Sequence, residues 1–426
     1  MKSSNHELPL FQINPAIKAL KPSATLVINE QCQQMTKNNE KVFRFGFGQS
    51  PFPVPDVVVE SLRKNAHQKA YLPVQGLLEL REAICGYILR TEQLSYTPDQ
   101  IIVGPGTKEL MFLLQSVNQA EILLPSPSWV SYAPQAEILG RKVTWLLEEG
   151  APDPDFVAST LEKRCIENPD QARLLVLNYP ENPSGRTYSE NQLEKIAQVA
   201  RRFNVIILSD EIYSGLHFDG SHRSVAQYYP EGTIISNGLS KWCGAGGWRL
   251  GAFVFPPALN DIKKAMCVLA SETFSAVSSP IQYASISAFE ESNELTDYLR
   301  IARMILKELG SYCYDRLDKA GAELVKPQGG FYLFPKMDAM RSRLKVDDSV
   351  SLCKKLLTET GVATLPGSVF GRPATELSMR LAYVDFDGTA AMNACEGQQT
   401  LEEGFLQTYC KTTVEGIDRL CQWLSS

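Results

Sequence analysis

Short apolar runs alternate with amphipathic helical patterns between about residues 98 and 256. The runs are rich in Ile, Leu and Val and contain few polar positions. Strands of this kind, separated by helices, are typical of a mostly parallel sheet whose two faces are both covered by helices. The pattern predicts seven strands, at residues 100–103, 121–124, 142–146, 172–178, 205–209, 233–236 and 251–255.

The pattern changes toward both ends of the chain. A long helical stretch is predicted at 294–320, short strands at 330–335 and 378–384, and an inserted surface loop in the polar stretch 385–407. We therefore predict an α/β fold in which a large domain holds the seven-stranded sheet and both termini form a smaller α+β domain. The predicted divisions are 1–50 for an N-terminal arm and part of the small domain, 51–300 for the large domain and 301–426 for the small C-terminal domain.

Composition narrows the class of protein. The chain has 426 residues, of which 44% are hydrophobic and 21% charged, so it is long enough for two domains and too balanced to be disordered. The net charge is −6 and the Lys and Arg residues are dispersed, which argues against nucleic acid or an anionic membrane as a partner. No apolar run approaches the ~20 residues that span a bilayer, and the first residues lack a signal-peptide core. A cytoplasmic protein is expected.

The cysteines and histidines indicate neither disulfides nor a metal site. The ten cysteines are scattered without a Cys-x-x-Cys pair, and we expect them to be reduced and mostly buried. The four histidines, His6, His67, His217 and His222, lack the spacing of zinc ligands. No metal site is therefore predicted.

The stretch 238–251, Gly-Leu-Ser-Lys-Trp-Cys-Gly-Ala-Gly-Gly-Trp-Arg-Leu-Gly, is the most informative part of the chain. A lysine in a crowded turn loses hydration, so the pKa of Lys241 falls and its free amine can attack an aldehyde. Arg249 supplies a planar, permanent cation for a phosphate. A glycine-rich loop with two solvated cations is the alternative. The complete pattern favours a covalently tethered phosphate cofactor.

A candidate phosphate cradle lies earlier in the chain. Residues 101–112 pass from an apolar strand through a glycine turn, Gly104-Pro105-Gly106, into an amphipathic helix. The N–H groups at the start of a helix can face an anion. A strand, turn and helix of this kind are common without any ligand. The interpretation as a phosphate site is therefore supported mainly by the presence of Lys241 and Arg249.

Two charged residues lie in or directly after predicted strands, where a charged side chain suggests a specific role. Asp210 directly follows the predicted strand 205–209, at the edge of the sheet where open α/β folds bind ligands. A carboxylate that pairs with a pyridine nitrogen keeps this nitrogen protonated. The alternative is that Asp210 caps the N-terminus of a helix, which is the commoner role of an Asp after a strand. Arg380 lies within the predicted strand 378–384, where it suits a bidentate grip on a carboxylate or a structural salt bridge.

These motifs resemble those of the class I/II aminotransferases, the fold-type I pyridoxal phosphate enzymes of the aspartate/aromatic aminotransferase kind. Residues 238–251 satisfy every restricted position of the family's lysine signature, and Asp210-Glu-Ile-Tyr213 and the loop 178–185, Asn-Tyr-Pro-Glu-Asn-Pro-Ser-Gly, fit the same family. The resemblance runs from Gly48 to Arg380. It implies a pyridoxal phosphate-dependent aminotransferase that moves an amino group between an L-amino acid and a 2-oxo acid, and a homodimer with shared active sites.

The resemblance also implies the roles of individual residues. Lys241 would carry the cofactor and move the substrate's Cα proton, Asp210 would pair with the ring nitrogen, and Tyr213 would donate to the ring oxygen. The implied cofactor-binding set is Gly106, Thr107, Lys108, Trp129, Asn182, Asp210, Tyr213, Ser240, Lys241 and Arg249, with Tyr71 reaching the phosphate of the neighbouring subunit. The implied substrate-binding set is Gly48, Asn182 and Arg380.

The chain departs from some relatives at Pro105 and Gly238, where they carry serines that contact the phosphate. Either Ser236 or Ser240 is expected to compensate. The amino acid used stays open, because no second cation clearly belongs to a dicarboxylate site and Lys108 cannot be given that role from its position. Tyr132 and Phe331 favour an aromatic or other apolar side chain, and core packing explains them equally well.

Two rival functions are weighed against transamination. A pyridoxal phosphate-dependent lyase or decarboxylase would use the same cofactor contacts and differ in its products. A non-catalytic cofactor-sensing protein would need an attached DNA-binding or interaction module. Residues 1–45 are too short for one and lack a basic helix-turn-helix pattern.

Overall fold

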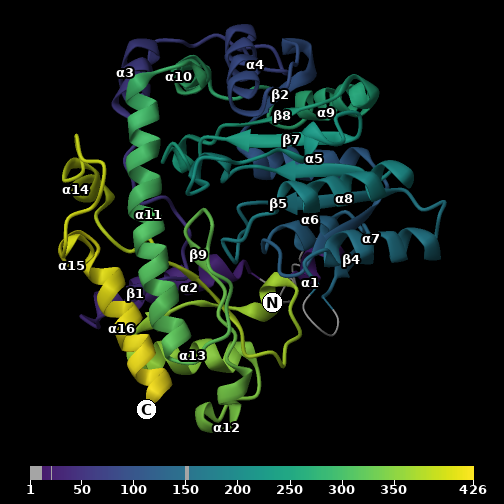
Figure 1. The fold of residues 1–426 in the computed structure, drawn as a ribbon. Coiled ribbons are helices and arrows are strands. Elements are labelled where there is room, and N and C mark those ends of the chain that lie inside the picture. The colour runs from purple at the N-terminus through teal and green to yellow at the C-terminus, as the bar shows by residue number, and fades with distance from the viewer. Residues whose placement is uncertain (1–11, 21, 149–152) are drawn as a thin grey trace, which may run out of the picture.

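The computed structural model describes residues 12–20, 22–148 and 153–426. Its centre is a seven-stranded sheet with the order β2-β8-β7-β6-β5-β3-β4 (Figure 1). β8 runs antiparallel to both of its neighbours, β2 and β7, and the other neighbouring pairs are parallel. The strands are β2 (Ile101–Gly104), β3 (Glu121–Pro125), β4 (Val143–Leu146), β5 (Arg173–Asn178), β6 (Ile206–Asp210), β7 (Thr233–Gly238) and β8 (Gly251–Val254). The predicted sheet and all seven of its strands are confirmed.

Helices cover both faces of this sheet. Successive residues of a strand point to opposite faces, so Leu174 joins one hydrophobic core and Leu175 the other. The first face is covered by α5 (Thr107–Val117), α6 (Tyr132–Ile138) and α9 (Asn260–Ser271), and the second by α7 (Phe156–Glu167) and α8 (Glu190–Arg202). Near β2, α10 (Ser279–Phe289) packs against α3 (Asp56–Asn65) and α4 (Leu78–Glu92). Burial on both faces explains why these strands are almost wholly apolar.

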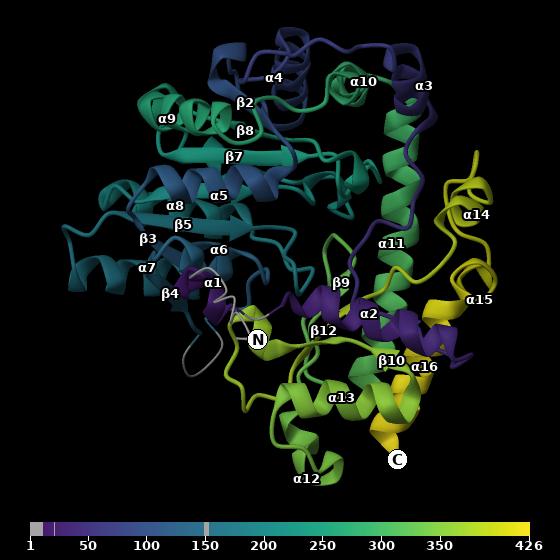
Figure 2. The same cartoon turned by 180° about the vertical axis from the view of Figure 1, so that it is seen from behind.

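Both ends of the chain contribute to a second, smaller group of elements (Figure 2). In one small sheet β1 (Phe43–Arg44) pairs in parallel with β10 (Val362–Ala363), and in another β12 (Met379–Ala382) lies between β11 (Leu365–Pro366) and β9 (Tyr332–Leu333). The helices here are α2 (Ala24–Lys37), α11 (Asn293–Lys319), α12 (Arg341–Leu344), α13 (Ser349–Thr360) and α16 (Lys411–Ser425), whereas α1 (Pro15–Ala19) contacts α6 of the large sheet layer. The predicted contribution of both termini is confirmed, while the domain boundaries stay a prediction.

The stretch 385–407 differs from the loop that was predicted. It contains α14 (Gly388–Asn393) and the start of α15 (Phe405–Tyr409), and α14 contacts α11. Ala391 and Phe405 are buried in the main core. The helices were missed because they are short and because Gly388 interrupts the pattern. That glycine lies against the backbone of Pro51, where a Cβ atom would collide with the carbonyl oxygen.

Two expectations from composition can be compared with the structure. All ten cysteines are free, and only Cys85 and Cys267 among them are not fully buried. Within the described ranges, none of the helices combines the length and the apolar character needed to cross a membrane. His6, one of the four histidines considered as metal ligands, lies outside the described residues.

Candidate active site

A cavity of about 510 Å³ lies beyond the carboxyl ends of the parallel strands. The segments that follow β2, β3, β5, β6 and β7 form much of its wall, and the smaller group of elements closes the other side. The walls include all but two of the residues expected to act here: Gly48, Thr107, Lys108, Trp129, Asn182, Asp210, Tyr213, Ser240, Lys241, Arg249 and Arg380. Distant parts of the sequence therefore meet at one place, with Gly106 and Tyr71 outside the lining.

One corner of the cavity is suited to an anion. Gly106 immediately precedes α5 with a φ of +89°, and a Cβ atom on it would collide with Nη2 of Arg249. Nη2 of Arg249 donates to the carbonyl of Pro105, at 3.3 Å. The guanidinium and the free N–H groups at the start of α5 therefore approach the same point, and only glycine leaves room for this approach.

Ser236 and Ser240 have different places in the structure. Ser240 lines the cavity together with Thr107 and Arg249. Ser236 is fully buried below it, and its hydroxyl donates to Oδ1 of Asp210 at 3.3 Å. Of the two serines, Ser240 is the one that faces the anion corner.

Lys241 lies half-buried at the side of the cavity. Its Nζ donates to the carbonyl of Gly48 at 2.7 Å and lies 5.7 Å from the ring centre of Tyr213. Burial, followed by the positive charge of Arg380, lowers the pKa of Lys241 to about 7, although Asp210 opposes the shift. A large fraction of this lysine is therefore a free amine near neutral pH.

Asp210 is the last residue of β6 and is buried in the floor of the cavity. Its Oδ2 accepts a hydrogen bond from the hydroxyl of Tyr132 at 2.6 Å. Burial raises the pKa of Asp210 to about 6, while the Tyr132 and Ser236 hydroxyls and the Ile212 backbone N–H hold it down. The side chain does not cap a helix. Among the described residues, Asp210 accepts from hydroxyls and a backbone N–H and forms no ion pair with a cation.

Tyr213 and Asn182 belong to a chain of polar contacts across the cavity. The hydroxyls of Tyr213 and Tyr332 are 2.9 Å apart, and Nδ2 of Asn182 lies 3.5 Å from the Tyr213 hydroxyl. The backbone N–H of Asn182 donates to Asn178, whose own amide donates to the carbonyl of Asp210. The loop 178–185 is thus held in register with the end of β6.

Tyr332 was not predicted as a site residue. It stands on β9 within the predicted strand 330–335, directly after Phe331. Phe331 lies just before β9, and its ring centre is 5.8 Å from Nζ of Lys241, so both neighbouring aromatic residues come near the site. The predicted strand 330–335 did not say which of its aromatic side chains would line the cavity.

Arg380 is 2% exposed and stands in the middle of β12. Nη1 donates to Oδ1 of Asn182 at 3.2 Å and Nη2 to the carbonyl of Gly46 at 2.7 Å, while Nε has no hydrogen-bond partner among residues 12–20, 22–148 and 153–426. Its guanidinium lies 4.9 Å from the ring centre of Tyr332. Among the residues that the structure describes, no carboxylate forms an ion pair with Arg380. The salt-bridge alternative is therefore wrong, and a buried cation is left free for an anionic ligand.

Trp129 and Lys108 border the anion corner. The Trp129 ring is partly buried and meets the Tyr132 ring edge-on, with centroids 5.2 Å apart. Nζ of Lys108 lies 4.9 Å from the centre of the Trp129 ring. Burial and the charge of Arg249 lower the pKa of Lys108. Trp129 thus offers an aromatic surface to a flat ligand.

Tyr71 lies away from the cavity. Its side chain is 95% exposed, whereas every other expected aromatic residue is at least partly buried. Tyr71 does not line the cavity of its own chain. The expectation that it reaches the site of a neighbouring subunit stays a prediction.

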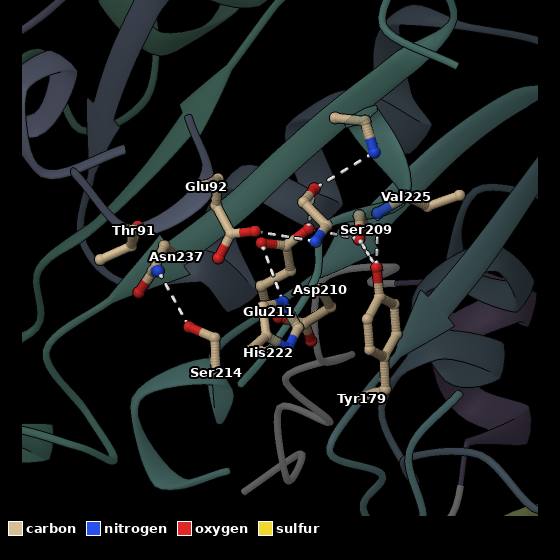
Figure 3. A network of polar contacts seen from close by, with 12 residues as sticks. Thr91, Glu92, Tyr179, Ser209, Asp210, Glu211, Ser214, His222, Val225 and Asn237 are labelled. Atoms are coloured by element: carbon tan, nitrogen blue, oxygen red, sulfur yellow. Dashed lines mark hydrogen bonds and ion pairs between the residues drawn. The ribbon is translucent and has the colours of Figure 1, made fainter. Parts of the chain in front are cut away.

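A buried polar network adjoins Asp210 without being part of the cavity wall (Figure 3). Oε1 of Glu211 accepts hydrogen bonds from the hydroxyls of Ser209 and Ser224, at 2.7 and 2.5 Å. Oε2 of Glu211 lies 3.3 Å from Nε2 of His222. Glu92, Glu211 and His222 place possible ligand atoms within 4.8 Å of one another. Hydroxyl and imidazole groups already surround Glu211, and the absence of a metal site stays a prediction.

Three comparisons bear on this geometry. The family model described as "Aminotransferase class I and II" matches residues 40–391. The chain is 33% identical to the aspartate aminotransferase of Bacillus sp. (strain YM-2) and 31% identical to the aspartate/prephenate aminotransferase of Thermus thermophilus, each alignment covering 86% of this chain and 93% of the relative. The solved structure of the Thermus thermophilus aspartate aminotransferase with maleate superposes with a TM-score of 0.81 at 27% identity, covering 97% of this chain and all of that one.

Proposed function

This chain belongs to the class I and II aminotransferases and is an aminotransferase, and on that basis we propose that it uses pyridoxal phosphate carried by Lys241. The amino group passes from an L-amino acid to a 2-oxo acid. One observation carries the proposal: Lys241, with its pKa lowered to about 7, lies in one cavity with the anion corner and with Arg380, a buried guanidinium that has no acidic partner among the described residues. A lysine in such surroundings is a nucleophile and a base near neutral pH.

The residues present fit this cofactor. The N–H groups that begin α5, the Thr107 and Ser240 hydroxyls and the Arg249 guanidinium would hold the phosphate. Asp210 is a buried carboxylate whose side-chain donors, within the part of the chain that the structure describes, are both hydroxyls, and it suits the protonated ring nitrogen. Tyr213 and Asn182 would donate to the ring oxygen, and Trp129 would cover one face of the ring. The cavity volume lies within the usual range for a cofactor with a small substrate.

When bound, pyridoxal phosphate supplies an aldehyde for covalent attachment and a ring that takes up the electron pair released at the substrate's Cα. The chain's own residues do the rest. Nζ of Lys241, once free, takes the proton from Cα and later returns a proton as an acid. Arg380 binds the substrate's α-carboxylate through its fork of N–H donors, and the Gly48 backbone borders the same space. These contacts hold Cα beside Nζ.

We also propose that the protein acts in the cytoplasm as a homodimer whose subunits share active sites. The exposure of Tyr71 supports its reaching the neighbouring subunit's phosphate corner. The proposed division is an N-terminal arm at 1–50, a cofactor-binding domain at 51–300 and a small domain at 301–426.

Chemical trapping tests the proposal. Sodium borohydride applied to the protein incubated with pyridoxal phosphate should fix one cofactor per chain, and mass spectrometry of the peptides should locate it on Lys241. The variant Lys241→Ala should trap none. Attachment to Lys108 in the same cavity, or equal labelling of the variant, would contradict the proposal.

A further inference from the structure

One tyrosine of the cavity wall contacts three of the groups to which the proposed function gives a role. Tyr332 stands on β9, lines the cavity and is 1% exposed. Its hydroxyl lies 2.9 Å from that of Tyr213 and 3.4 Å from the carbonyl oxygen of Gly48. The guanidinium of Arg380 lies 4.9 Å from the centre of its ring. Tyr332 therefore belongs to the site, although the proposed reaction gives it no bond to make or break.

The Tyr332 hydroxyl is better placed to bind Tyr213 than Gly48. The Gly48 carbonyl already accepts from Nζ of Lys241 at 2.7 Å, and it is the more distant of the two partners of Tyr332. The rings of Tyr213 and Tyr332 meet edge-on, with centroids 5.6 Å apart. Burial raises the pKa of both tyrosines, so both hydroxyls keep their protons near neutral pH.

The hydrogen-bonding capacity of the Tyr213 hydroxyl limits where its proton can point. A hydroxyl offers one proton and two lone pairs. Nδ2 of Asn182 can only donate, and it lies 3.5 Å from the Tyr213 oxygen. When Tyr332 donates as well, both lone pairs are used and the single proton of Tyr213 is left for the cofactor's ring oxygen. A hydroxyl that accepts hydrogen bonds is also a stronger donor, because the bonds polarise one another.

The ring of Tyr332 has a different neighbour. The buried guanidinium of Arg380 lies over this ring, and the Phe370 ring is 5.2 Å away from the same guanidinium. A cation is attracted to the face of an aromatic ring, and this attraction uses none of the N–H donors of the guanidinium. The ring can therefore hold Arg380 in place and leave its donors to other partners.

Tyr332 also accounts for the glycine at position 48. A Cβ atom on Gly48 would collide with the Tyr332 hydroxyl. The Gly48 backbone is thus packed directly against this side chain, and the approach requires a residue without a side chain.

We infer that Tyr332 is a positioning residue with two separable functions: its hydroxyl directs the Tyr213 proton to the cofactor's ring oxygen, and its ring supports the guanidinium that binds the substrate's α-carboxylate. The inference rests on the proposed function, from which it takes the roles of Tyr213 and Arg380. It follows that loss of one oxygen atom from Tyr332 should alter the bound cofactor and leave carboxylate binding intact.

A spectral titration of the full-length holoenzyme tests the hydroxyl without turnover. A hydrogen bond donated to the ring oxygen stabilises its anionic form, so the lysine-bound cofactor loses its proton at a lower pH. In Tyr332→Phe the pH at which the visible absorption band changes should therefore rise, by about half a pH unit or more.

Tyr383→Phe is the matched control. Tyr383 is also fully buried, its hydroxyl contacts the carbonyl of Gly330 at 3.4 Å, and it does not line the cavity. This variant should titrate like the unmodified holoenzyme. An unchanged titration in Tyr332→Phe, or an equal shift in the control, would overturn the inference.

A double variant shows whether the effect passes through Tyr213. Tyr213→Phe alone should raise the titration midpoint at least as much as Tyr332→Phe. The variant with both substitutions should titrate like Tyr213→Phe alone, because Tyr332 acts through a hydroxyl that is then missing. Additive shifts would show that Tyr332 affects the cofactor by another route and would contradict the inference.

The ring is tested by comparing two substitutions at the same position. The dissociation constant of an amino acid would be measured from the concentration dependence of the single-turnover rate. Tyr332→Phe keeps the ring and should leave this constant within about twofold, whereas Tyr332→Leu should raise it about fivefold. Both variants lack the hydroxyl, so both should show the same spectral shift. Equal dissociation constants in the two variants would refute the support of Arg380 by the ring.

The same measurements separate the inference from the proposed function. An unmodified protein that shows no visible band with pyridoxal phosphate, or converts no amino acid, would overturn the proposed function. A normal band and normal turnover, with no shift of the titration in Tyr332→Phe, would overturn the inference alone.

Discussion

At the scale of single residues, neighbours decide the chemistry of the ionisable groups. Lys241 and Asp210 both lose hydration in the cavity, which lowers the pKa of the lysine and raises that of the acid. The sequence predicted both residues, because each stands in a recognisable local pattern. It did not predict that Tyr132 donates to Asp210, because that hydrogen bond joins segments 78 positions apart. Contacts of this kind depend on the packing of whole elements.

Tyr132→Phe tests the control of Asp210. The Tyr132 hydroxyl holds the carboxyl pKa below the value that burial alone would give, so its loss should raise that pKa further above 6. The active carboxylate would then be lost at a higher pH. The acidic limb of the profile of kcat/KM against pH should therefore move upward, by about one pH unit.

Tyr179→Phe provides the control for this experiment. Tyr179 is equally buried, and its hydroxyl contacts Ser209 and the backbone of Val225 rather than Asp210. Its profile should keep the acidic limb of the unmodified enzyme. A limb that stays in place or moves downward in Tyr132→Phe would refute the role given to the hydroxyl.

At the scale of elements, periodicity predicted what is long or buried on both faces. The seven strands and the helix α11 follow from apolar runs and amphipathic repeats. α14 and α15 were missed, because six and five residues show too little of a helical period. The pattern of apolar and polar residues also did not predict which elements contact one another. The cavity wall combines the start of α2, the start of α5 and β12, which no local signal connects.

An alanine at position 106 tests whether the turn between β2 and α5 must leave space for Arg249. In Gly106→Ala the new Cβ atom would displace the Arg249 guanidinium and strain a backbone with a φ of +89°. The affinity for pyridoxal phosphate should fall by about tenfold or more, as measured by titration of the apoenzyme.

Gly140→Ala separates strain from displacement. Gly140 also has a positive φ, of +63°, but a Cβ atom there would have no neighbour within 4 Å. This variant should lose stability and keep its cofactor affinity. Equal affinities in the two alanine variants would show that Arg249 does not need the space beside Gly106.

The buried network joins α4 to the end of β6 and makes stability depend on pH. Burial, and then the charge of Glu211, raises the pKa of Glu92 to about 7 from an ordinary value of 4.5. Between these values the folded chain holds a proton that the unfolded chain has released, so this contribution to stability is lost as the pH rises through 7. In Glu92→Gln, the melting temperature should therefore fall less between pH 5 and pH 8 than it does in the unmodified protein.

The exposed Glu79 of the same helix serves as the control. Glu79→Gln should keep the pH dependence of the unmodified protein, because its carboxyl is hydrated in both states. A melting curve for Glu92→Gln that responds to pH as strongly as before would show that Glu92 does not hold this proton.

At the scale of the whole molecule, the site depends on chain segments that meet only in the complete fold. Gly48 precedes the strands of the large sheet in the sequence and Arg380 follows them, and α11 runs beside both groups of elements (Figure 1). The family resemblance anticipated this convergence of distant motifs. Composition and periodicity alone would have predicted the layers of the fold without the cavity.

Mixed dimers test whether subunits share their sites. Lys241→Ala and Tyr71→Ala chains should each be nearly inactive alone. When they are unfolded and refolded together, a mixed dimer has one site with both Lys241 and the partner subunit's Tyr71. Activity should therefore return to a substantial fraction of that of the unmodified protein. No recovery, in a mixture shown to contain mixed dimers, would mean that Tyr71 serves its own chain or no site.

A single-turnover experiment tests the central claim most directly. The holoenzyme would be mixed with one amino acid, without an acceptor, and both its absorption spectrum and the carbon product would be measured. We predict that the absorption band of the lysine-bound cofactor disappears as one equivalent of the corresponding 2-oxo acid forms per site. Release of ammonia or carbon dioxide in place of the 2-oxo acid, or a protein that shows no such band after addition of pyridoxal phosphate, would contradict it.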